Sequence, residues 1–452
     1  MHPGALGVRE SVLSAGGVVA GNVLKKPAML DIKLIRERPD FVKAELAKVL
    51  CPTTMVDELL AVDRIRREAL HVLESRRAER TRRSKEIGAL PPEERKTAGA
   101  ALESLSDSIT EAETAAATAE ARFDELMLEL PNLPHESVPV GPDETANVLV
   151  RSEGEQARFD FVPLPHWEIG PALGAIDFER GVKISGTRFY VLTGIGARLQ
   201  RALISFMLDV HTREHGYLEV YPPAMVKKQC LVGTGNLPKF ADTVYHDAEE
   251  DFWFVPTAEV PVTNLYRDEI LDGAALPIRH VAYSPCFRRE KMSAGRDVRG
   301  IKRGHQFDKV EMVKFVRPED SDRELASLLN DAETICCRLG LAHRVLQMCT
   351  GDLSFTAALK FDVEIWAPGC AEWLEVSSCS NFRDFQARRA NIRYRPSAQA
   401  KPEFVHTING SGLALPRVLI AVLETYQQAD GSVRVPDALR SYLGGVDFLR
   451  PL

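Results

Sequence analysis

The sequence lacks the cysteine patterns that are typical of metal-binding sites. Its eight cysteines include no C-x-x-C pair and no Cys/His cluster with the spacing of a zinc site. Scattered thiols, partly flanked by apolar residues, are typical of a reduced cytosolic protein. We therefore expect a cytoplasmic protein without a structural zinc ion.

Long apolar runs are also missing, so the sequence predicts no span across a membrane and no membrane partner. The nearest candidate, residues 11–24, is uncharged but rich in glycine. Glu10 precedes it and Lys25 and Lys26 follow it, which is a poor charge context for a signal peptide. We interpret residues 1–28 as a disordered extension or an upstream start.

Glycine-rich nucleotide-binding loops are absent. Gly194-Ile-Gly196 has no third glycine at the dinucleotide-binding spacing, and no Walker-type phosphate loop occurs. A net charge of −7 excludes a global positive field, so any nucleic-acid contact must use local basic patches. With 452 residues the chain is long enough for two or three domains.

A basic loop lies between two predicted strands, 281–287 and 307–316. It contains Ser293, Gly295 and Gly300 among the basic residues Arg288, Arg289, Lys291, Arg296, Arg299, Lys302 and Arg303. Guanidinium groups pair bidentately with phosphate oxygens, and strand ends fix where they point. A charge run alone favours a solvated hairpin. Phe-Arg-x-Glu at 287–290, followed by Phe307 and Glu311, favours a polyphosphate site instead.

This stretch closely resembles motif 2 of the class II aminoacyl-tRNA synthetases, in the form typical of seryl-tRNA synthetase. Three further segments resemble that family's active-site segments and occur in its order: Thr-Ala-Glu-Val-Pro (257–261), Glu-Val-Ser-Ser-Cys-Ser-Asn (375–381) and Asn-Gly-Ser-Gly-Leu-Ala (409–414). With Met-Leu-Asp-Ile-Lys-Leu-Ile-Arg at 29–36, the resemblance covers residues 29–445. Several ordered segments are far more specific than any one of them.

The first domain, residues 29–135, has helical periodicity. We expect a helix over 31–50, then one over 54–87 that starts with a capping box of Thr54 and Asp57. Residues 88–92 break the pattern, a second long helix covers 93–130, and 131–134 end it. Two long helices joined by a short turn pack antiparallel. About 30 residues per helix at about 1.5 Å each give an arm of roughly 45 Å.

The two predicted helices carry opposite charges. Residues 64–85 hold nine Arg/Lys against three Glu, and residues 93–130 hold ten Asp/Glu. A solvated coiled coil that mediates dimerisation is one reading; we favour an arm that lies on a phosphate backbone. The resemblance implies that this hairpin binds tRNA(Ser). Our candidate tRNA contacts are Arg76, Arg77, Arg80, Arg82, Arg83 and Lys85.

Residues 136–165 are predicted to be a linker, and 166–452 the catalytic domain. Short alternating strands without β-α-β spacing (188–192, 217–221, 252–255, 281–287, 307–316, 362–366 and 373–378) predict an antiparallel sheet flanked by helices at 196–215, 319–339 and 414–428. The fold class is therefore α+β, with an N-terminal helical hairpin. His211-Thr-Arg-Glu-His215 fits an inverted zinc-protease pattern, but the segment more closely resembles the family's motif 1, which implies a homodimer.

The resemblance also implies roles at an ATP site. Arg288 neutralises the α-phosphate and the amino-acid carboxylate, Arg417 holds the γ-phosphate, Glu290 accepts from the adenine amino group, and Phe307 stacks on the ring. Arg289, Val376 and Ser377 belong to the same site. Glu375 and Ser378 bind Mg²⁺, since hard cations prefer oxygen ligands.

A small polar pocket is expected to select L-serine, with Thr257, Ala258, Glu259, Glu311 and Ser411 as its residues. A pocket that hydrogen-bonds a hydroxyl rejects alanine, which leaves its polar groups unpaired. Taken singly, each acid is more simply a surface salt-bridge partner and Ser411 a helix N-cap. The ordered set of segments favours the pocket.

Two departures from the family pattern affect efficiency rather than reaction class. Leu415-Pro416 precedes Arg417 where a smaller, non-proline residue is usual, and Arg289 stands where serine is common. The predicted function is ATP-dependent formation of seryl-adenylate and transfer to tRNA(Ser), with use of tRNA(Sec) left open. The alternatives are a serine-activating paralogue that loads a carrier protein and an inactive RNA-binding paralogue.

Overall fold

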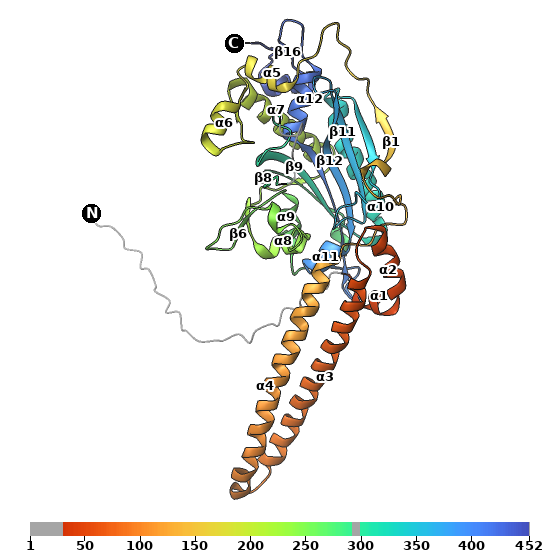
Figure 1. Ribbon diagram of the computed structural model, residues 1–452, viewed down its shortest axis with the longest axis vertical. Helices are drawn as coiled ribbons and strands as arrows, with labels where there is room; N and C mark the ends of the chain where they lie inside the picture. Colours follow the sequence, from red (N-terminus) through yellow and green to blue (C-terminus); the bar gives the residue numbers. More distant parts are fainter. Residues whose placement is uncertain (1–29, 292–298, 452) are drawn as a thin grey trace, which may run out of the picture.

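The computed structural model describes residues 30–291 and 299–451, without the side chains of 96–101. The predicted extension 1–28, and Ser293, Gly295 and Arg296 of the basic loop, lie outside this part of the chain. The molecule consists of a long helical arm and a larger body built on a sheet (Figure 1).

Two short helices, α1 (Ile32–Glu37) and α2 (Pro39–Lys48), replace the single helix expected over 31–50. Pro39 explains the break, because proline disfavours the helical conformation of the residue before it. Arg38 accordingly has φ −137° and ψ 55°. Asp31 caps α1 by accepting a 2.9 Å hydrogen bond from the Lys33 amide.

The arm consists of α3 (Thr54–Gly88) and α4 (Pro92–Glu129), which run side by side away from the body (Figure 1). The predicted hairpin is present, but its capping box is not, since the N-cap is Thr53 and forms no side-chain cap bond. A separate small cluster along the arm contains Leu73, Ile109, Ala112 and Ala116. Such a thin, alanine-rich seam lets the arm project without a core of its own.

The base of the arm is anchored on the body by α11 (Phe385–Arg389). Phe385 is fully buried in the same apolar cluster as Leu59 of α3 and Met127 of α4. The Arg388 guanidinium pairs with Asp31 at 3.3 Å. Sequence-distant residues therefore fix where the arm leaves the body.

The body is built on an eight-stranded sheet with the order β1-β10-β11-β12-β15-β9-β8-β4. All its neighbouring strands pair antiparallel except β4 and β8, which confirms the predicted antiparallel sheet. Its strands are β1 (Val148–Glu153), β4 (Leu218–Glu219), β8 (Ile278–Phe287), β9 (Gln306–Val316), β10 (His343–Gln347), β11 (Leu359–Ala367), β12 (Glu372–Arg383) and β15 (His406–Ala414). The edge strand β1 lies within the stretch predicted as a linker.

Three helices cover one face of this sheet: α7 (Gly194–Arg213), α10 (Ser321–Arg338) and α12 (Leu415–Thr425). They share one buried core with Val310 and Met312 of β9 and Val376 of β12. Because strand side chains alternate, Lys309 and Glu311 of β9 point to the opposite face. The candidate site lies on that second face.

Smaller elements complete the body. They are α5 (His166–Ala172), α6 (Phe178–Ser185), α8 (Lys228–Thr234), α9 (Glu259–Thr263), β2 (Ile176–Asp177), β3 (Val191–Leu192), β5 (Met225–Lys227), β6 (Phe252–Phe254), β7 (Ile270–Asp272), β13 (Arg393–Arg395), β14 (Glu403–Phe404), β16 (Val433–Arg434) and β17 (Phe448–Leu449). Among them, β3 is shorter than the strand predicted at 188–192, and β6 is shorter than the strand predicted at 252–255.

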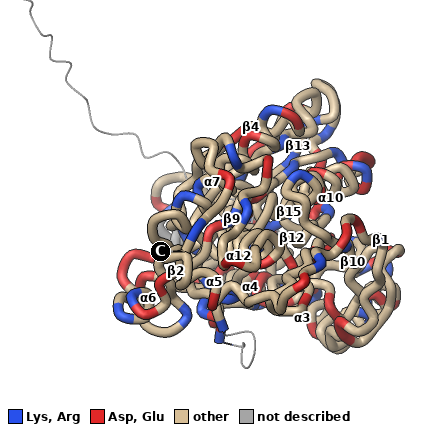
Figure 2. Tube along the Cα trace, turned by 90° about the horizontal axis from the view of Figure 1, so that it is seen from above, with Lys and Arg blue, Asp and Glu red and all other residues tan. Residues whose placement is uncertain are grey.

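Charges of both signs are spread around the body when it is seen from above (Figure 2). This agrees with a chain whose net charge is only −7. Among residues 30–291 and 299–451, no helix combines the length and apolar character needed to cross a membrane.

Candidate active site

The strand pair β8–β9 places Arg288 beside Phe307. Cys286 lies opposite Phe307 and Phe287 opposite Gln306 in the ladder, and Arg288 follows the last residue of β8. The Arg288 amide donates to the His305 carbonyl at 2.9 Å, which holds the two strand ends together. The Arg288 guanidinium lies 5.1 Å from the centre of the Phe307 ring. One arginine and one aromatic ring thus share the end of the hairpin.

Glu290 and Arg289 diverge from that point. Glu290 has a positive φ of 44°, an uncommon conformation for a residue with a side chain, and its carboxylate lies 3.7 Å from the Arg303 guanidinium. The Arg289 guanidinium instead lies 5.8 Å from the Tyr245 ring. Strained backbone of this kind is frequent at functional sites.

A β-bulge in β12 brings Glu375 and Ser378 to the same face. The register between β11 and β12 shifts so that Val363 pairs with Ser377 but Glu364 pairs with Glu375, which leaves Val376 as the extra residue. Val376 is buried in the helix-covered core. Ser377 is buried too, and its hydroxyl donates to the Ser411 carbonyl at 2.7 Å. Of the predicted ATP-site residues, these two therefore support the site without offering it their side chains.

Arg417 reaches the same region from the first turn of α12. Its Nη1 lies 3.7 Å from a carboxylate oxygen of Glu375 and donates to the Glu375 carbonyl oxygen. Pro416 occupies the first turn, where its missing amide costs no hydrogen bond. The proline therefore does not keep Arg417 from Glu375.

The oxygens beside Glu375 are suited to a hard divalent cation. Asp362 lies opposite Ser378 in the ladder, and its buried Oδ1 has no hydrogen-bond partner among residues 30–291 and 299–451. Burial and the nearby Glu375 raise the pKa of Asp362 to about 7. The side chain of Glu375 is 45% exposed, so burial opposes its ionisation only partly, and Arg417 and Lys360 outweigh burial and lower the pKa of Glu375. Carboxylates and a hydroxyl with spare acceptor capacity match what Mg²⁺ prefers.

Glu311 forms the centre of a second polar group on the same face. Its carboxylate is 2.6 Å from the Lys309 ammonium and accepts from the Asn409 amide at 3.2 Å and the Ser411 hydroxyl at 3.3 Å. Glu311 is 1% exposed, so it is not a surface salt-bridge residue. Ser411 is on β15 and the N-cap of α12 is Ala414, so Ser411 is not a helix cap either.

Glu259 faces this group from the start of α9. Burial, and then the charge of Glu311, raise the pKa of Glu259 to about 7. The Gln386 amide donates to its Oε1 at 2.5 Å. Thr257 and Ala258, just before it, are buried. The structure thus brings all five predicted serine-pocket residues into one part of the molecule.

Lys309, Gln386, Asn409 and Asp362 are site-lining residues that the sequence analysis did not single out. Lys309 is buried on its face of β9, although a lysine in a strand is ordinarily expected at the surface. Asn409 is the first residue of the Asn-Gly-Ser-Gly-Leu-Ala motif, so its position in the site could have been predicted from the sequence. No sequence pattern marks Gln386, because it is 127 residues from Glu259 in the chain and only the tertiary fold brings the two side chains together.

Two clusters outside this region have the donor types of a metal site. His166, Cys370 and Glu424 form one, and Glu153, Cys337 and His343 form the other. In the inverted zinc-protease pattern, the His211 ring instead contacts the Gly412 carbonyl at 3.1 Å and the His215 ring at 3.0 Å. Those two rings are engaged with each other and with backbone, which does not fit a catalytic metal.

The predicted tRNA contacts fall into two groups along α3. Arg76 donates to the Ser108 carbonyl and Arg77 pairs with Glu113 at 2.7 Å, so both also join α3 to α4. Arg83 pairs with Glu79 at 2.6 Å on its own helix. The other three residues, Arg80, Arg82 and Lys85, are exposed, and Arg82 also lies 3.8 Å from Glu86 on the same helix.

Comparisons with known proteins agree with this geometry. Residues 29–134 match the family profile described as the seryl-tRNA synthetase N-terminal domain, and residues 242–426 match the tRNA synthetase class II core domain (G, H, P, S and T). The serine–tRNA ligase of Thermomicrobium roseum is 61% identical over 418 residues, which are 92% of this chain and 94% of that protein. The chain belongs to the seryl-tRNA synthetase family.

Further relatives support the same assignment. The serine–tRNA ligase of Roseiflexus sp. (strain RS-1) is 60% identical over 93% of this chain and all of its own length. The seryl-tRNA synthetase of Pyrococcus horikoshii, solved in complex with ATP, has a TM-score of 0.85 and 38% identity, covering 94% of this chain and 100% of that one. The resemblance seen in the ordered motifs is confirmed, and the protein is an aminoacyl-tRNA synthetase that activates serine and charges tRNA.

Proposed function

We propose that Arg288, Arg417 and Glu290 bind ATP, and that Glu259, Glu311 and Ser411 bind serine, on the face of the antiparallel sheet opposite α7, α10 and α12. The observation that carries this proposal is the meeting of Arg288, Phe307, Glu375 and Arg417 at one end of the sheet, next to the buried Glu311 group. Side chains from four strands and one helix converge there without a glycine-rich phosphate loop.

The reaction joins two anions and therefore needs charge cancellation more than covalent chemistry. The serine carboxylate attacks the α-phosphorus of ATP, a new carboxyl–phosphorus bond forms, and the bond to pyrophosphate breaks. Arg288 neutralises the α-phosphate and the incoming carboxylate, while Arg417 holds the γ-phosphate. Phe307 stacks on adenine, Glu290 accepts from its amino group, and Arg289 adds positive charge at the rim.

The Glu311 group supplies the serine pocket. Glu311 and Glu259 offer two carboxylates to the serine ammonium, and Ser411 and Thr257 offer hydroxyls to its side chain. Ala258 leaves room at the pocket wall. Lys309 balances Glu311 when serine is absent, since the two are in direct contact. A pocket of this kind rejects alanine because it leaves buried polar groups unpaired.

Glu375 and Ser378 hold Mg²⁺ in this proposal, with Asp362 as a further oxygen donor next to them. A bound Mg²⁺ neutralises phosphate charge and orients the leaving pyrophosphate. The protein's own contribution is to hold these oxygens on one face through the β12 bulge.

The arm binds tRNA(Ser) through the basic face of α3 and brings its acceptor end to the sheet. The three exposed residues Arg80, Arg82 and Lys85 supply phosphate contacts, and Arg76, Arg77 and Arg83 add charge from the same helix. Whether tRNA(Sec) is also a substrate is part of the same test. We further propose a cytoplasmic homodimer that uses α7 at its interface.

Serine-dependent ATP–pyrophosphate exchange, measured with and without tRNA, tests the proposal. We expect serine-dependent exchange without tRNA and serylation of tRNA(Ser). A separate serylation assay with tRNA(Sec) decides whether that tRNA is also a substrate. Exchange without any tRNA charging supports the carrier-protein paralogue. No exchange supports the inactive RNA-binding paralogue.

A further inference from the structure

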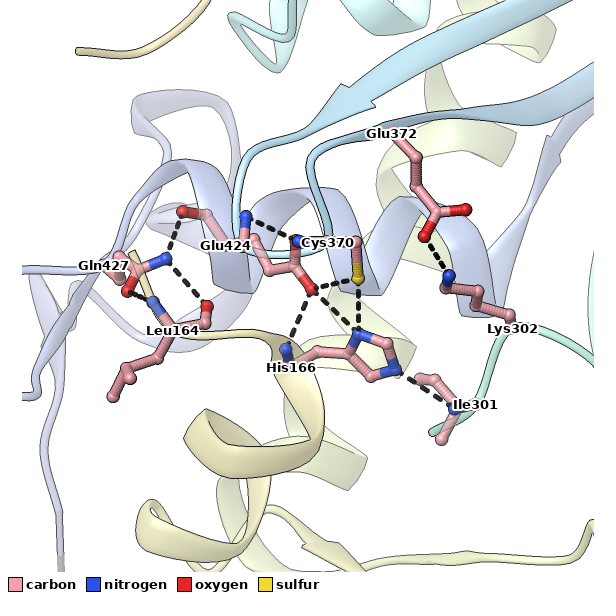
Figure 3. A network of polar contacts seen from close by, with 9 residues as sticks. Leu164, His166, Ile301, Lys302, Cys370, Glu372, Glu424 and Gln427 are labelled. Atoms are coloured by element: carbon pink, nitrogen blue, oxygen red, sulfur yellow. Dashed lines mark hydrogen bonds and ion pairs between the residues drawn. The ribbon is translucent and has the colours of Figure 1, made fainter. Parts of the chain in front are cut away.

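The carboxylate of Glu424 is the centre of a buried network away from the substrates (Figure 3). Its Oε1 accepts from the amide and from Nδ1 of His166, both at 2.8 Å, and from the Cys370 thiol at 3.1 Å. Its Oε2 accepts from the amides of Gly369 and Cys370 at 2.9 and 3.0 Å. The side chains of His166 and Glu424 are 0% exposed. Five donors thus satisfy one buried anion.

The tautomer of His166 follows from its two contacts. The Ile301 amide donates to Nε2 at 3.2 Å, so Nε2 carries the lone pair. Nδ1 must then carry the proton that it donates to Glu424. A metal ion held by Nδ1 together with Cys370 and Glu424 would need the lone pair on Nδ1 and the proton on Nε2, which would then face the hydrogen of the Ile301 amide. The network is therefore complete as a set of hydrogen bonds, and it does not fit a metal site.

Residues 299–305 are the segment that His166 contacts, and they lead directly into β9. Gly300 has φ +76°, and a Cβ there would lie 2.0 Å from His166 Nε2, so the ring and the backbone are in closest contact. The Arg299 guanidinium lies 4.7 Å from the Trp167 ring, next to His166 on α5. Lys302 pairs with Glu372 at the start of β12. We call residues 299–305 the returning segment.

The returning segment contacts the residues that we assign to ATP. His305 accepts from the Arg288 amide at 2.9 Å, and its ring nitrogen Nδ1 lies 3.1 Å from the Arg288 carbonyl oxygen. Arg303 lies 3.7 Å from Glu290. Ile301 is therefore only two residues from the contact of Arg303 with Glu290 and four residues from the contact of His305 with Arg288, so a shift at Ile301 should move both contacts.

Glu424 also links the other two elements of the site. It lies on α12, seven positions after Arg417. Gly369 and Cys370, whose amides it accepts, form the turn between β11 and β12, and β12 carries Glu375. One carboxylate thus joins α12, the β11–β12 turn and, through His166, the returning segment.

We propose that His166, oriented by Glu424, is a positioning residue for ATP that holds the returning segment through the Ile301 amide. It rests on the proposed ATP site but touches no substrate. Glu424 orients the His166 ring, and the ring accepts a hydrogen bond from the Ile301 amide. Ile301 in turn holds the returning segment against Arg288 and Glu290, and Glu424 holds α12, which carries Arg417.

Two substitutions separate the halves of this link. In His166→Gln, the amide reaches the position of Nε2 and restores the acceptor for Ile301. In His166→Asn, the shorter amide reaches only the position of Nδ1 and restores the donor to Glu424. We expect His166→Asn and His166→Ala to raise the KM for ATP in serine-dependent exchange about tenfold, the factor that corresponds to one lost hydrogen bond. His166→Gln should stay within about threefold of wild type, and the KM for serine should change less than that for ATP in all three.

A readout that does not depend on activity is amide hydrogen exchange of the peptide covering residues 299–305. Exchange at Ile301 should be faster in His166→Asn and His166→Ala and near that of wild type in His166→Gln. His343→Gln, at a buried histidine of β10 remote from the site, is the matched control and should alter neither readout. If thermal stability falls while the KM for ATP and the Ile301 exchange are unchanged, or if Asn and Gln behave alike, the proposal is wrong. A wild type that shows no serine-dependent exchange overturns the proposed function instead, and the amide exchange then still decides the role of His166.

Discussion

At the scale of single residues, the site depends on charges held where burial would otherwise remove them. Glu311 keeps three donors, Glu375 lies beside Arg417, and Glu424 has five. Burial raises the pKa of the Cys370 thiol, as does the neighbouring Glu424. Burial acts in the same direction on Glu424, but hydrogen bonds from His166 and Cys370 outweigh it and lower the pKa of that carboxyl. These carboxylates differ in their surroundings, since Glu311 and Glu375 lie in the proposed substrate site, whereas three of the five donors to Glu424 are backbone amides.

Arg288 is expected to be essential because its guanidinium lies 5.1 Å from the centre of the Phe307 ring at the proposed ATP site. We expect Arg288→Ala to reduce serine-dependent exchange by about 10²–10³-fold, the usual loss for one preorganised charge donor. Arg288→Lys should also be impaired, since an ammonium cannot pair bidentately. Binding of tRNA, measured by filter retention, should stay unchanged. Arg289→Ala is the control: its guanidinium contacts Tyr245, so a loss as large as that of Arg288→Ala would contradict the assignment.

The pKa of about 7 for Glu259 predicts a pH dependence of serine binding. Below that pH the carboxyl is protonated and cannot pair with the serine ammonium, so the KM for serine should rise as the pH falls from 8 to 6. The KM for ATP should change less over the same range. Glu259→Gln should raise the KM for serine at pH 8 and remove most of its pH dependence. An unchanged pH profile in this variant would assign the effect to another group.

At the scale of elements, the helical hairpin and the antiparallel sheet could be predicted, whereas several local details could not. Charge and periodicity at 54–130 indicated the two arm helices nearly to their ends, because an isolated arm has few tertiary contacts to override local pattern. The division of the predicted helix 31–50 into α1 and α2 was not predicted, although Pro39 is a known helix breaker. β1 was missed because its six residues are exposed and are held by pairing with β10 and by the contact of Arg151 with Glu333 of α10, which are both long-range. Which residues share a face of β12 could not be predicted either, since the bulge at Val376 depends on the partner strand.

The arm should serve tRNA charging but not adenylation. We expect Arg80, Arg82 and Lys85, changed together to Gln, to raise the KM for tRNA at least about tenfold and to flatten its salt dependence, since each phosphate contact releases counterions. Exchange without tRNA should stay at the wild-type rate. Replacement of the outer arm, residues 70–116, by a short linker leaves the apolar cluster around Phe385 in place and should abolish charging while sparing exchange.

A matched control lies on the other helix of the arm. Glu103, Asp107 and Glu111 are exposed on α4, and their joint change to Gln should leave the KM for tRNA near or below that of wild type. If both triple variants weaken charging equally, the arm acts through its own stability rather than through phosphate contacts.

At the scale of the whole molecule, α11 lies between the arm and the serine pocket. Phe385 is buried in the cluster at the base of the arm, while the next residue, Gln386, donates to Glu259 at 2.5 Å and accepts from the Thr407 hydroxyl at 2.7 Å. Arg389 donates to the Leu128 carbonyl of α4 at 3.0 Å. A helix of five residues therefore contacts both the arm that we propose binds tRNA and Glu259 of the proposed serine pocket.

This arrangement predicts that loosening α11 affects both substrates, whereas loosening the arm alone affects one. Phe385→Leu should cost about 1 kcal/mol of stability, a usual value for a core substitution, and should raise the KM for serine and the KM for tRNA together. Phe123→Leu, in the same cluster but on α4, should raise only the KM for tRNA. Exchange assays give the first constant and charging assays the second. If neither variant alters the KM for serine, Gln386 is held independently of the arm and α11 does not connect the two sites.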